Sequence, residues 1–142
     1  MEKDQIPDPL FTLRGDMDAI HCLLFQLRAD SEYLLASTQS GTVHKWNLQT
    51  CREDFRFPIS NESCLTIKYL DNVFISQTKG GEIKFWEEED GTWNLKGKLN
   101  TGYWGFCKLD TYSHKLLVCP EAGSKMRVVG VDGKTVSECI VG

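Results

Sequence analysis

Cysteine is the residue type through which this chain could do the most chemistry, as a metal ligand or as a nucleophile. The chain has six cysteines, and Cys22, Cys64 and Cys107 recur 42 and 43 residues apart. No Cys-x-x-Cys pair, the usual spacing of a zinc site, is present. Because the three positions follow a repeat, we expect these thiols to be small buried residues. Three aligned thiols on neighbouring strands could still bind a soft metal ion, which stays open as an alternative.

The other chemical patterns in the sequence are incomplete. The three histidines stand alone, and no Gly-x-Ser-x-Gly nucleophile motif is present. Gly133-Lys134-Thr135 resembles the end of a phosphate-binding loop, but the loop requires a glycine where this chain has Val128. The acidic run Glu87-Glu88-Glu89-Asp90 is expected at a solvated hairpin tip, where no pocket separates the pKa values of paired carboxylates. We therefore expect no enzyme, no catalytic residue, no cofactor and no resident metal.

A sequence motif occurs twice in the chain, and the structure that it forms must position the cysteines and the other polar residues. Gly41-Thr42-Val43-His44-Lys45-Trp46-Asn47-Leu48 returns as Gly81-Glu82-Ile83-Lys84-Phe85-Trp86-Glu87. The two tryptophans are 40 residues apart. A period of about 40–45 residues that ends near Trp-Asp is typical of a propeller blade.

Each repeat divides into four short runs with the composition of β-strands, separated by turn residues. The pattern predicts an all-β fold of four-stranded antiparallel units and shows no amphipathic helix. The predicted strands are 19–25, 33–37, 42–48 and 53–57 in the first repeat, 64–69, 73–76, 82–86 and 92–96 in the second, and 105–109, 116–119, 126–129 and 135–141 in the third.

These strands predict how the chain is organised. Residues 1–9 contain two prolines and are expected to form a flexible lead, and residues 10–15 to form a strand that closes the last blade of a ring. Blades are expected at 19–57, 64–99 and 105–141. Propellers need at least four blades, because one blade cannot cover its own apolar faces. We therefore expect a fragment or a short isoform that leaves apolar faces exposed, with self-assembly into a ring as an alternative.

The repeats resemble WD40 repeats throughout residues 10–142. Segments 8–15, 40–50, 105–107 and 116–120 are similar to a narrower family of ASTRA-associated, G-protein β-subunit-like WD40 proteins. This resemblance implies a partial WD40 β-propeller of about three blades, taken from a seven-bladed ring without catalytic activity. It also implies a link to a chromatin-associated assembly and to the co-chaperone system that matures phosphatidylinositol-3-kinase-like kinases.

Some positions depart from the WD40 pattern. Asn47 and Glu87 follow the two tryptophans where an aspartate is usual, and Ser40 stands where the turn aspartate is expected. The hydrogen-bond chain of an ideal blade is therefore incomplete. The indole N–H of Trp46 still needs an acceptor, and we expect Ser37 to supply it.

Composition excludes some partners. The formal net charge is −4, with 16 basic and 20 acidic residues, which argues against direct, sequence-independent binding of nucleic acid. No apolar run approaches the roughly 18 residues of a membrane-spanning helix, and the N-terminus lacks the apolar region of a signal peptide. We expect an intracellular protein, cytoplasmic and nuclear, with protein partners, no membrane and no small-molecule substrate.

These observations predict a non-enzymatic protein-interaction scaffold, which the resemblance connects with the assembly or stability of phosphatidylinositol-3-kinase-like kinases. Loops on a rigid scaffold commonly carry binding. The candidate protein-binding residues lie in the loops that line one propeller face, and they are Asp16, Asp18, Gln39, Ser40 and Lys79. The alternatives are a Gβ-like signalling subunit, a ubiquitin-ligase substrate receptor, or an enzyme or metal protein built on the aligned cysteines.

Overall fold

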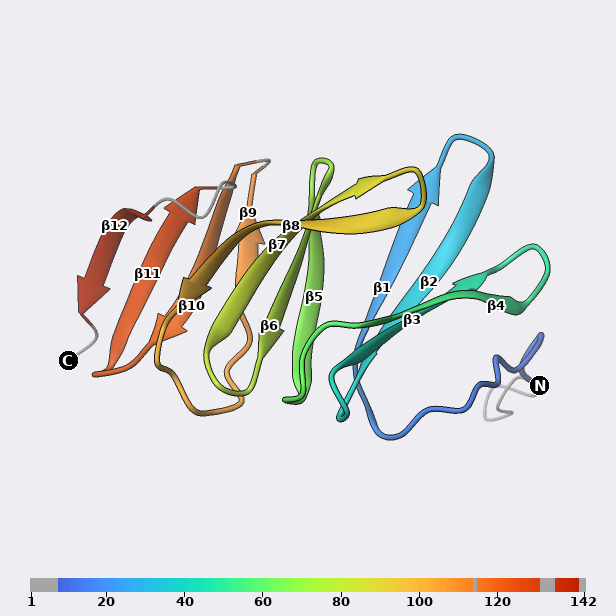
Figure 1. Ribbon diagram of the computed structural model, residues 1–142, viewed down its shortest axis with the longest axis horizontal. Coiled ribbons are helices and arrows are strands. Elements are labelled where there is room, and N and C mark those ends of the chain that lie inside the picture. The colour runs from blue at the N-terminus through green and yellow to red at the C-terminus, as the bar shows by residue number, and fades with distance from the viewer. Residues whose placement is uncertain (1–7, 114, 131–134, 141–142) are drawn as a thin grey trace, which may run out of the picture.

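The computed structural model describes residues 8–113, 115–130 and 135–140. Within these residues every regular element is a strand, and none is a helix long and apolar enough to cross a membrane. The strands form three four-stranded sheets, each in sequential order and antiparallel throughout. Blade 1 is β1 (Ile20–Arg28), β2 (Ser31–Thr38), β3 (Thr42–Asn47) and β4 (Arg52–Pro58); blade 2 is β5 (Cys64–Leu70), β6 (Val73–Thr78), β7 (Glu82–Glu89) and β8 (Thr92–Asn100); blade 3 is β9 (Asp110–Tyr112), β10 (Leu116–Glu121), β11 (Lys125–Gly130) and β12 (Thr135–Ile140). The blades stand side by side in chain order (Figure 1).

Two glycines fix the same turn in blades 1 and 2. Gly41 and Gly81 both have a positive φ, 84° and 83°, which favours glycine. A Cβ atom at Gly41 would lie 2.1 Å from the carbonyl oxygen of Ser60, and one at Gly81 would lie 2.6 Å from the main-chain nitrogen of Tyr103. The loop that leaves each blade therefore packs directly on the turn between the second and third strands. The glycine that opens each repeated phrase in the sequence is required by this contact.

Side chains between the blades form two apolar clusters. The first includes Leu35 and Val43 of blade 1 with Ile67, Phe74 and Trp93 of blade 2. Its aromatic rings pack closely, with the ring centroids of Phe74 and Trp93 4.1 Å apart. The second cluster joins blades 2 and 3 and consists of Leu70, Ile75, Ile83, Phe85, Leu109, Leu117, Cys119 and Val129. Each blade is therefore stabilised by burying its apolar face against the next blade.

One face of β1 has no such neighbour among the described residues. Alternate side chains of a strand point to opposite faces of the sheet. Cys22 and Leu24 pack against the cluster between blades 1 and 2, whereas Leu23, Phe25 and Leu27 on the other face are exposed. The expectation that the first blade leaves an apolar face uncovered is confirmed.

Residues 10–15 are not a strand, contrary to the prediction. A strand needs the main chain of a neighbour, and the predicted partner was the last blade of a ring, which the described residues do not include. Instead the indole Nε1 of Trp46 donates to the carbonyl oxygen of Arg14 over 3.4 Å. A Cβ atom at Gly15 would lie 3.2 Å from the Trp46 ring. The segment therefore covers the tryptophan of blade 1. Of the predicted lead 1–9, residues 1–7 lie outside the described part of the chain.

The expected acceptor for Trp46 was wrong, although the equivalent bond exists in blade 2. Ser37 donates its hydroxyl hydrogen to the carbonyl oxygen of Cys64 in the next blade, over 2.9 Å. In blade 2, Trp86 donates to the hydroxyl of Ser76 over 3.0 Å. The approach of residues 10–15 gives Trp46 a main-chain acceptor, which leaves Ser37 to connect the two blades.

The first strand of blade 3 was also misplaced. Residues 105–109 were predicted as a strand, but the strand in this position is β9, which begins at Asp110. The buried side-chain amide of Gln77 forms hydrogen bonds with the main chain of the segment just before β9, through both its nitrogen and its oxygen. Its amide donates to the carbonyl oxygen of Cys107 over 3.0 Å and its oxygen accepts from the main-chain N–H of Leu109 over 2.7 Å. These two bonds replace the pairing of a regular strand, so residues 101–109 form a loop.

Candidate protein-interaction face

The five residues predicted from the sequence belong to one end of the blades, which we call the loop face. In an antiparallel meander, the turn after the second strand and the connection after the fourth strand lie at the same end of the sheet. The loop face therefore comprises residues 16–19, 39–41, 59–63, 79–81, 101–109 and 122–124. Four of the five predicted residues are exposed, and Lys79 is half-buried.

Three of the five line a common groove. Asp16, Asp18 and Ser40 border a cavity of about 340 Å³, whose other lining residues are Met17, Thr42, His44 and Arg56. The structure thus brings together residues that are more than 20 positions apart in the sequence.

A charge network supports the wall of this groove. Nδ1 of His44 lies 2.8 Å from Oε1 of Glu53, and Nε of Arg56 lies 3.0 Å from the same oxygen. The hydrogen bond from Arg56 lowers the pKa of Glu53, burial opposes that change, and the bond with His44 adds to it. The net result is a pKa below the usual 4.5. Glu53 therefore stays ionised and acts as a fixed acceptor for its two neighbours.

The other two predicted residues lie outside this groove but are tied to the same face. The N–H of Gln39 donates to the carbonyl oxygen of Ala19 over 2.8 Å, and the hydroxyl of Ser63 donates to the carbonyl oxygen of Gln39 over 2.9 Å. The N–H of Lys79 in turn donates to the carbonyl oxygen of Ser63 over 2.9 Å. These bonds connect loops of blades 1 and 2 into a continuous, fixed surface.

Two aromatic residues of the loop face were missed. Trp104 and Phe106 are 68% and 66% exposed. The ammonium of Lys79 lies 4.8 Å from the centroid of the Phe106 ring, and a Cβ atom at Gly80 would lie 3.7 Å from the Trp104 ring. The signal that could have found them is the run of aromatics around Gly105, but that run was assigned in part to a strand. Because residues 101–109 form a loop, the two rings reach solvent beside a predicted contact residue.

The aligned cysteines do not converge on a site. Cys64 is buried, as predicted, whereas Cys22 is half-buried and Cys107 is exposed. Burial raises the pKa of the Cys64 thiol to about 12. Over the described ranges, no three His, Cys, Asp or Glu side chains are grouped so that they could hold a metal ion. The prediction of packing thiols therefore holds for Cys64 and is wrong for Cys107, which the loop exposes.

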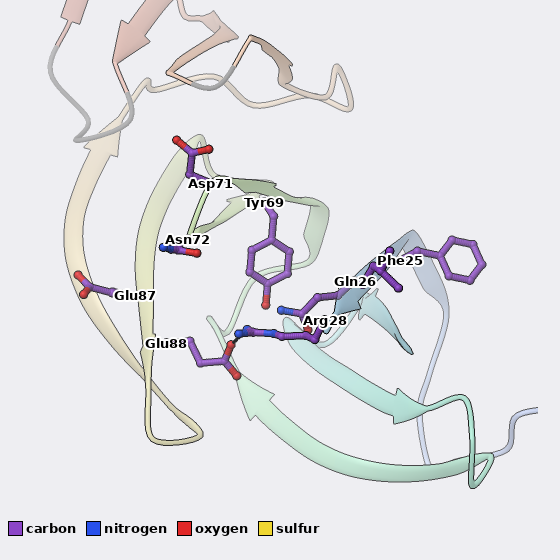
Figure 2. A pocket seen from close by; sticks show the side chains of 9 residues that line it. Phe25, Gln26, Arg28, Tyr69, Asp71, Asn72, Glu87 and Glu88 are labelled. Atoms are coloured by element: carbon purple, nitrogen blue, oxygen red, sulfur yellow. Dashed lines mark hydrogen bonds and ion pairs between the residues drawn. The ribbon is translucent and has the colours of Figure 1, made fainter. Parts of the chain in front are cut away.

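A second cavity, of about 520 Å³, lies between blades 1 and 2 at the opposite end of the strands (Figure 2). The ends of β1, β5 and β7 line it, and sequence reasoning gave no sign of it. Arg28 of blade 1 forms an ion pair with Glu88 of blade 2 at its edge. The side chains of Gln26, Arg28, Tyr69 and Glu88 point toward one another across the gap (Figure 2).

The chain is similar in sequence to known proteins that are longer than it is. No protein-family model matches it. It is 30% identical over 83 residues to ASTRA-associated protein 1 of Lodderomyces elongisporus, a match that covers 58% of this chain and 20% of that protein. It is 28% identical over 108 residues to guanine nucleotide-binding protein subunit beta-like protein 1 of Mus musculus, covering 72% of this chain and 33% of that protein. The chain thus spans a third or less of the length of these relatives.

Solved structures resemble the chain in fold. The WD40 repeats of RRP9 match with a TM-score of 0.69 at 15% identity, over 91% of this chain and 41% of that one. The β-propeller domain of Cps50 (Swd1) from Myceliophteria thermophila matches with a TM-score of 0.68 at 11% identity, over 84% of this chain and 40% of that one. At these identities the similarity concerns the fold alone.

Proposed function

We propose that this chain, a WD40-repeat protein whose blades have the β-propeller fold, is a non-enzymatic scaffold that binds other proteins through its loop face. The observation that carries the proposal is the exposure of Trp104 and Phe106 beside Lys79. Exposed aromatic residues next to a cation are typical anchors of protein interfaces. The loops that hold them are fixed to a rigid β scaffold, the arrangement in which binding residues are commonly found.

The electrostatics of Glu53, at the wall of the groove, argue against a role of this carboxylate as a general acid. A carboxyl group that acts as a general acid at neutral pH needs a raised pKa. The pKa of Glu53 is lowered, and its carboxylate already accepts from His44 and Arg56. Such a group stabilises the blade and offers its neighbours no proton to transfer.

The finer proposal is that the partners belong to assemblies that build or stabilise phosphatidylinositol-3-kinase-like kinases, including ASTRA-type complexes and their co-chaperones. Support comes from the similarity to a protein named ASTRA-associated protein 1, which agrees with the sequence segments that suggested this family. The same proposal places the chain in the cytoplasm and the nucleus, which imaging of a tagged chain would test.

A second candidate function is a Gβ-like signalling subunit or a ubiquitin-ligase substrate receptor. The similarity to a protein named guanine nucleotide-binding protein subunit beta-like protein 1 favours the first of these two. A small Gγ-type helical partner or a cullin adaptor would then be the protein recovered with the chain.

Affinity capture with quantitative mass spectrometry tests both candidates. Charge reversal of the predicted contacts uses Asp16→Lys, Asp18→Lys and Lys79→Glu together, and the control reverses the same charges away from the loop face with Asp30→Lys, Asp54→Lys and Lys115→Glu. We expect kinases of this class or their co-chaperones to be captured by the wild type and the control and to be depleted about tenfold by the loop-face variant. Equal recovery by both variants would contradict binding through this face, and recovery of Gγ-type or cullin partners would favour the second candidate.

A further inference from the structure

The exposed face of β1 has the register of a surface that another blade covers. Its side chains are Leu23, Phe25 and Leu27, which are 59%, 75% and 79% exposed, and we call it the entry face. Strand pairing gives Leu23 the place that Ile67 has in blade 2, and it likewise gives Phe25 the place of Tyr69. In blade 2 these two side chains pack into the cluster that joins it to blade 1, where Ile67 is fully buried. The repeat therefore gives β1 the surface with which a blade receives the blade before it.

Blade 3 carries the opposite kind of face. Leu117 and Val129 pack against blade 2, so their neighbours on β10 and β11 point away from blade 2. These neighbours and one residue of β9 form what we call the exit face: Tyr112, Leu116, Val118, Met126 and Val128. Tyr112 and Met126 are exposed, and the other three are half-buried. Asp110, on the same side of β9, is already paired with Lys68 of blade 2 over 3.4 Å.

The positions of the exit face form the contact with the next blade elsewhere in the chain. In blade 1 two of these positions are held by Leu35 and Val43, which are buried with Ile67 of blade 2 in one cluster. Val118 and Met126 hold the same two positions in blade 3. The exit face of blade 3 and the entry face of blade 1 are thus the two halves of a contact that the chain already makes between its own blades.

We propose that two copies of this chain associate head to tail, with the exit face of each copy packed on the entry face of the other. Val118 and Met126 of one copy then take toward Leu23 of the other copy the place that Leu35 and Val43 take toward Ile67. A second copy is the occupant because each chain supplies one face of each kind, and the two faces lie at opposite ends of the row of blades (Figure 1). The proposal is independent of the proposed function.

The number of copies follows from closure of the ring. Head-to-tail contacts between different surfaces form a closed ring or an open filament. Two copies of three blades give six blades, which lies within the range of about four to eight blades of closed propellers. Three copies would give nine blades, beyond that range. We therefore expect a closed dimer with two identical contacts.

The segment before β1 leaves the entry face open. Residues 10–15 cover Trp46, at the place where Phe57 of β4 covers Trp86 with ring centroids 5.2 Å apart. The strand of blade 2 that meets blade 1 is β5, which contacts β1 and β2. In the dimer β1 accordingly meets β9 and β10 of the other copy. These are the inner strands of blade 3, which carry Tyr112, Leu116 and Val118.

Sedimentation velocity of the full chain at several concentrations is the first test. A single chain has a mass of 16.1 kDa. We expect the mass to rise to that of two chains, with a dissociation constant on the order of 10 µM, and to rise no further. A single chain at every concentration up to about 200 µM would overturn the proposal and leave the entry face to further blades of a longer chain. A mass that keeps growing beyond two chains would contradict a closed dimer.

One substitution in each face provides the second test. Leu23→Glu and Met126→Glu should each weaken the dimer at least about tenfold, because each places an unpaired charge in an apolar contact. The two side chains are 59% and 44% exposed in the single chain, so the unfolding midpoint of the monomer in urea should stay close to that of the wild type. The control is Leu95→Glu, which alters a 50% exposed leucine of β8 outside both faces and should dimerise like the wild type. Equal dimerisation of all three variants would overturn the proposal.

Mixing the two variants distinguishes head-to-tail contacts from contacts between like faces. An equimolar mixture of Leu23→Glu and Met126→Glu should recover a dimer, because the intact exit face of the first meets the intact entry face of the second. This dimer has one intact contact and should be weaker than that of the wild type, and its formation also shows that both variants are folded. Normal dimerisation of either variant alone, or no recovery on mixing, would contradict the head-to-tail arrangement.

Failure of this proposal is separable from failure of the proposed function. The residues of the loop face belong to neither end face. Met126→Glu should therefore capture the same protein partners as the wild type, whether or not the chain forms a dimer.

Discussion

The indole Nε1 of Trp86 donates to the hydroxyl of Ser76 over 3.0 Å, and both residues are buried within blade 2. The equivalent tryptophan of blade 1, Trp46, donates to the carbonyl oxygen of Arg14 instead. Blade 2 therefore supplies the hydrogen-bond acceptor for its own tryptophan. In blade 1 the acceptor comes from the segment that precedes the first strand. The repeats share their strands and turns but not all of their internal hydrogen bonds.

Replacing Ser76 with alanine should destabilise the chain. The substitution leaves the buried N–H of Trp86 without an acceptor, which costs about 1–3 kcal/mol of the free energy of unfolding. Urea unfolding followed by tryptophan fluorescence measures the change. The matched control is Ser40→Ala on the exposed turn of blade 1, which should shift the free energy by less than about 0.5 kcal/mol. Equal effects of the two substitutions would show that the bond of Trp86 contributes nothing.

Stability should fall in acid partly because of Glu53. Its pKa is lowered in the folded chain, first by the hydrogen bond from Arg56. A carboxylate with a lowered folded-state pKa stabilises the fold above its unfolded pKa, and this contribution is lost as the pH falls through the folded value. The free energy of unfolding of the wild type should therefore decrease from about pH 5 downward, and Glu53→Gln should flatten part of that decrease.

Part of the acid dependence should persist in Glu53→Gln, because Glu82 and Asp110 also have lowered pKa values. The control is Glu62→Gln on the exposed loop after blade 1, which should follow the wild-type curve. Urea unfolding at several pH values measures all three chains. A Glu53→Gln curve parallel to that of the wild type would contradict the role assigned to the pair with Arg56.

The cysteines of the repeat should differ in reactivity despite their equal spacing. Cys64 is buried and its pKa is raised to about 12, so at neutral pH it carries almost no thiolate, the reactive form. Cys107 is exposed on the loop face. Iodoacetamide should label Cys107 within the time in which Cys64 in the folded chain stays unlabelled, as read by peptide mass spectrometry. In urea, where the chain is unfolded, Cys64 and Cys107 should be labelled equally, which serves as the reference. Equal labelling rates of these two cysteines in the folded chain would contradict the burial of Cys64.

Most of the fold was predictable because it depends on local patterns. The glycine turns at Gly41 and Gly81 and the strand composition around them recur at a fixed period, and the structure places four-stranded sheets where that period predicts them. Two segments were predicted wrongly, because their conformation depends on residues that are far away in the sequence. Residues 105–109 are a loop because Gln77, about 30 positions away, binds their main chain. Residues 10–15 lack a strand partner and cover Trp46 instead.

The candidate site was predictable only in outline. Loop position alone identified Asp16, Asp18 and Ser40, and these three border one groove. The exposure of Trp104 was missed although the run of aromatic residues around Gly105 is visible in the sequence, because aromatic residues are usually buried and a strand was predicted to begin beside it. The cavity near Gln26 was hidden for a different reason. It depends on how two blades meet, and no pattern within either repeat encodes that contact.

Trp104 and Phe106 are the residues on which the proposed function rests most heavily. The variant Trp104→Ala/Phe106→Ala removes both rings while leaving the blades intact, because neither ring is part of the clusters between blades. Its unfolding midpoint in urea should stay close to that of the wild type. The matched control is Tyr112→Ala, which removes an equally exposed ring from the opposite end of blade 3.

The most direct measurement is quantitative capture of protein partners from cell extract by the wild type, Trp104→Ala/Phe106→Ala and Tyr112→Ala, with each chain verified to be folded. We predict that the partners recovered with the wild type are retained by Tyr112→Ala and reduced at least about tenfold by the double variant, since loss of an aromatic anchor commonly costs about 2 kcal/mol or more of binding free energy. Undiminished recovery of those partners by a folded Trp104→Ala/Phe106→Ala chain would contradict the assignment of the loop face as the binding surface.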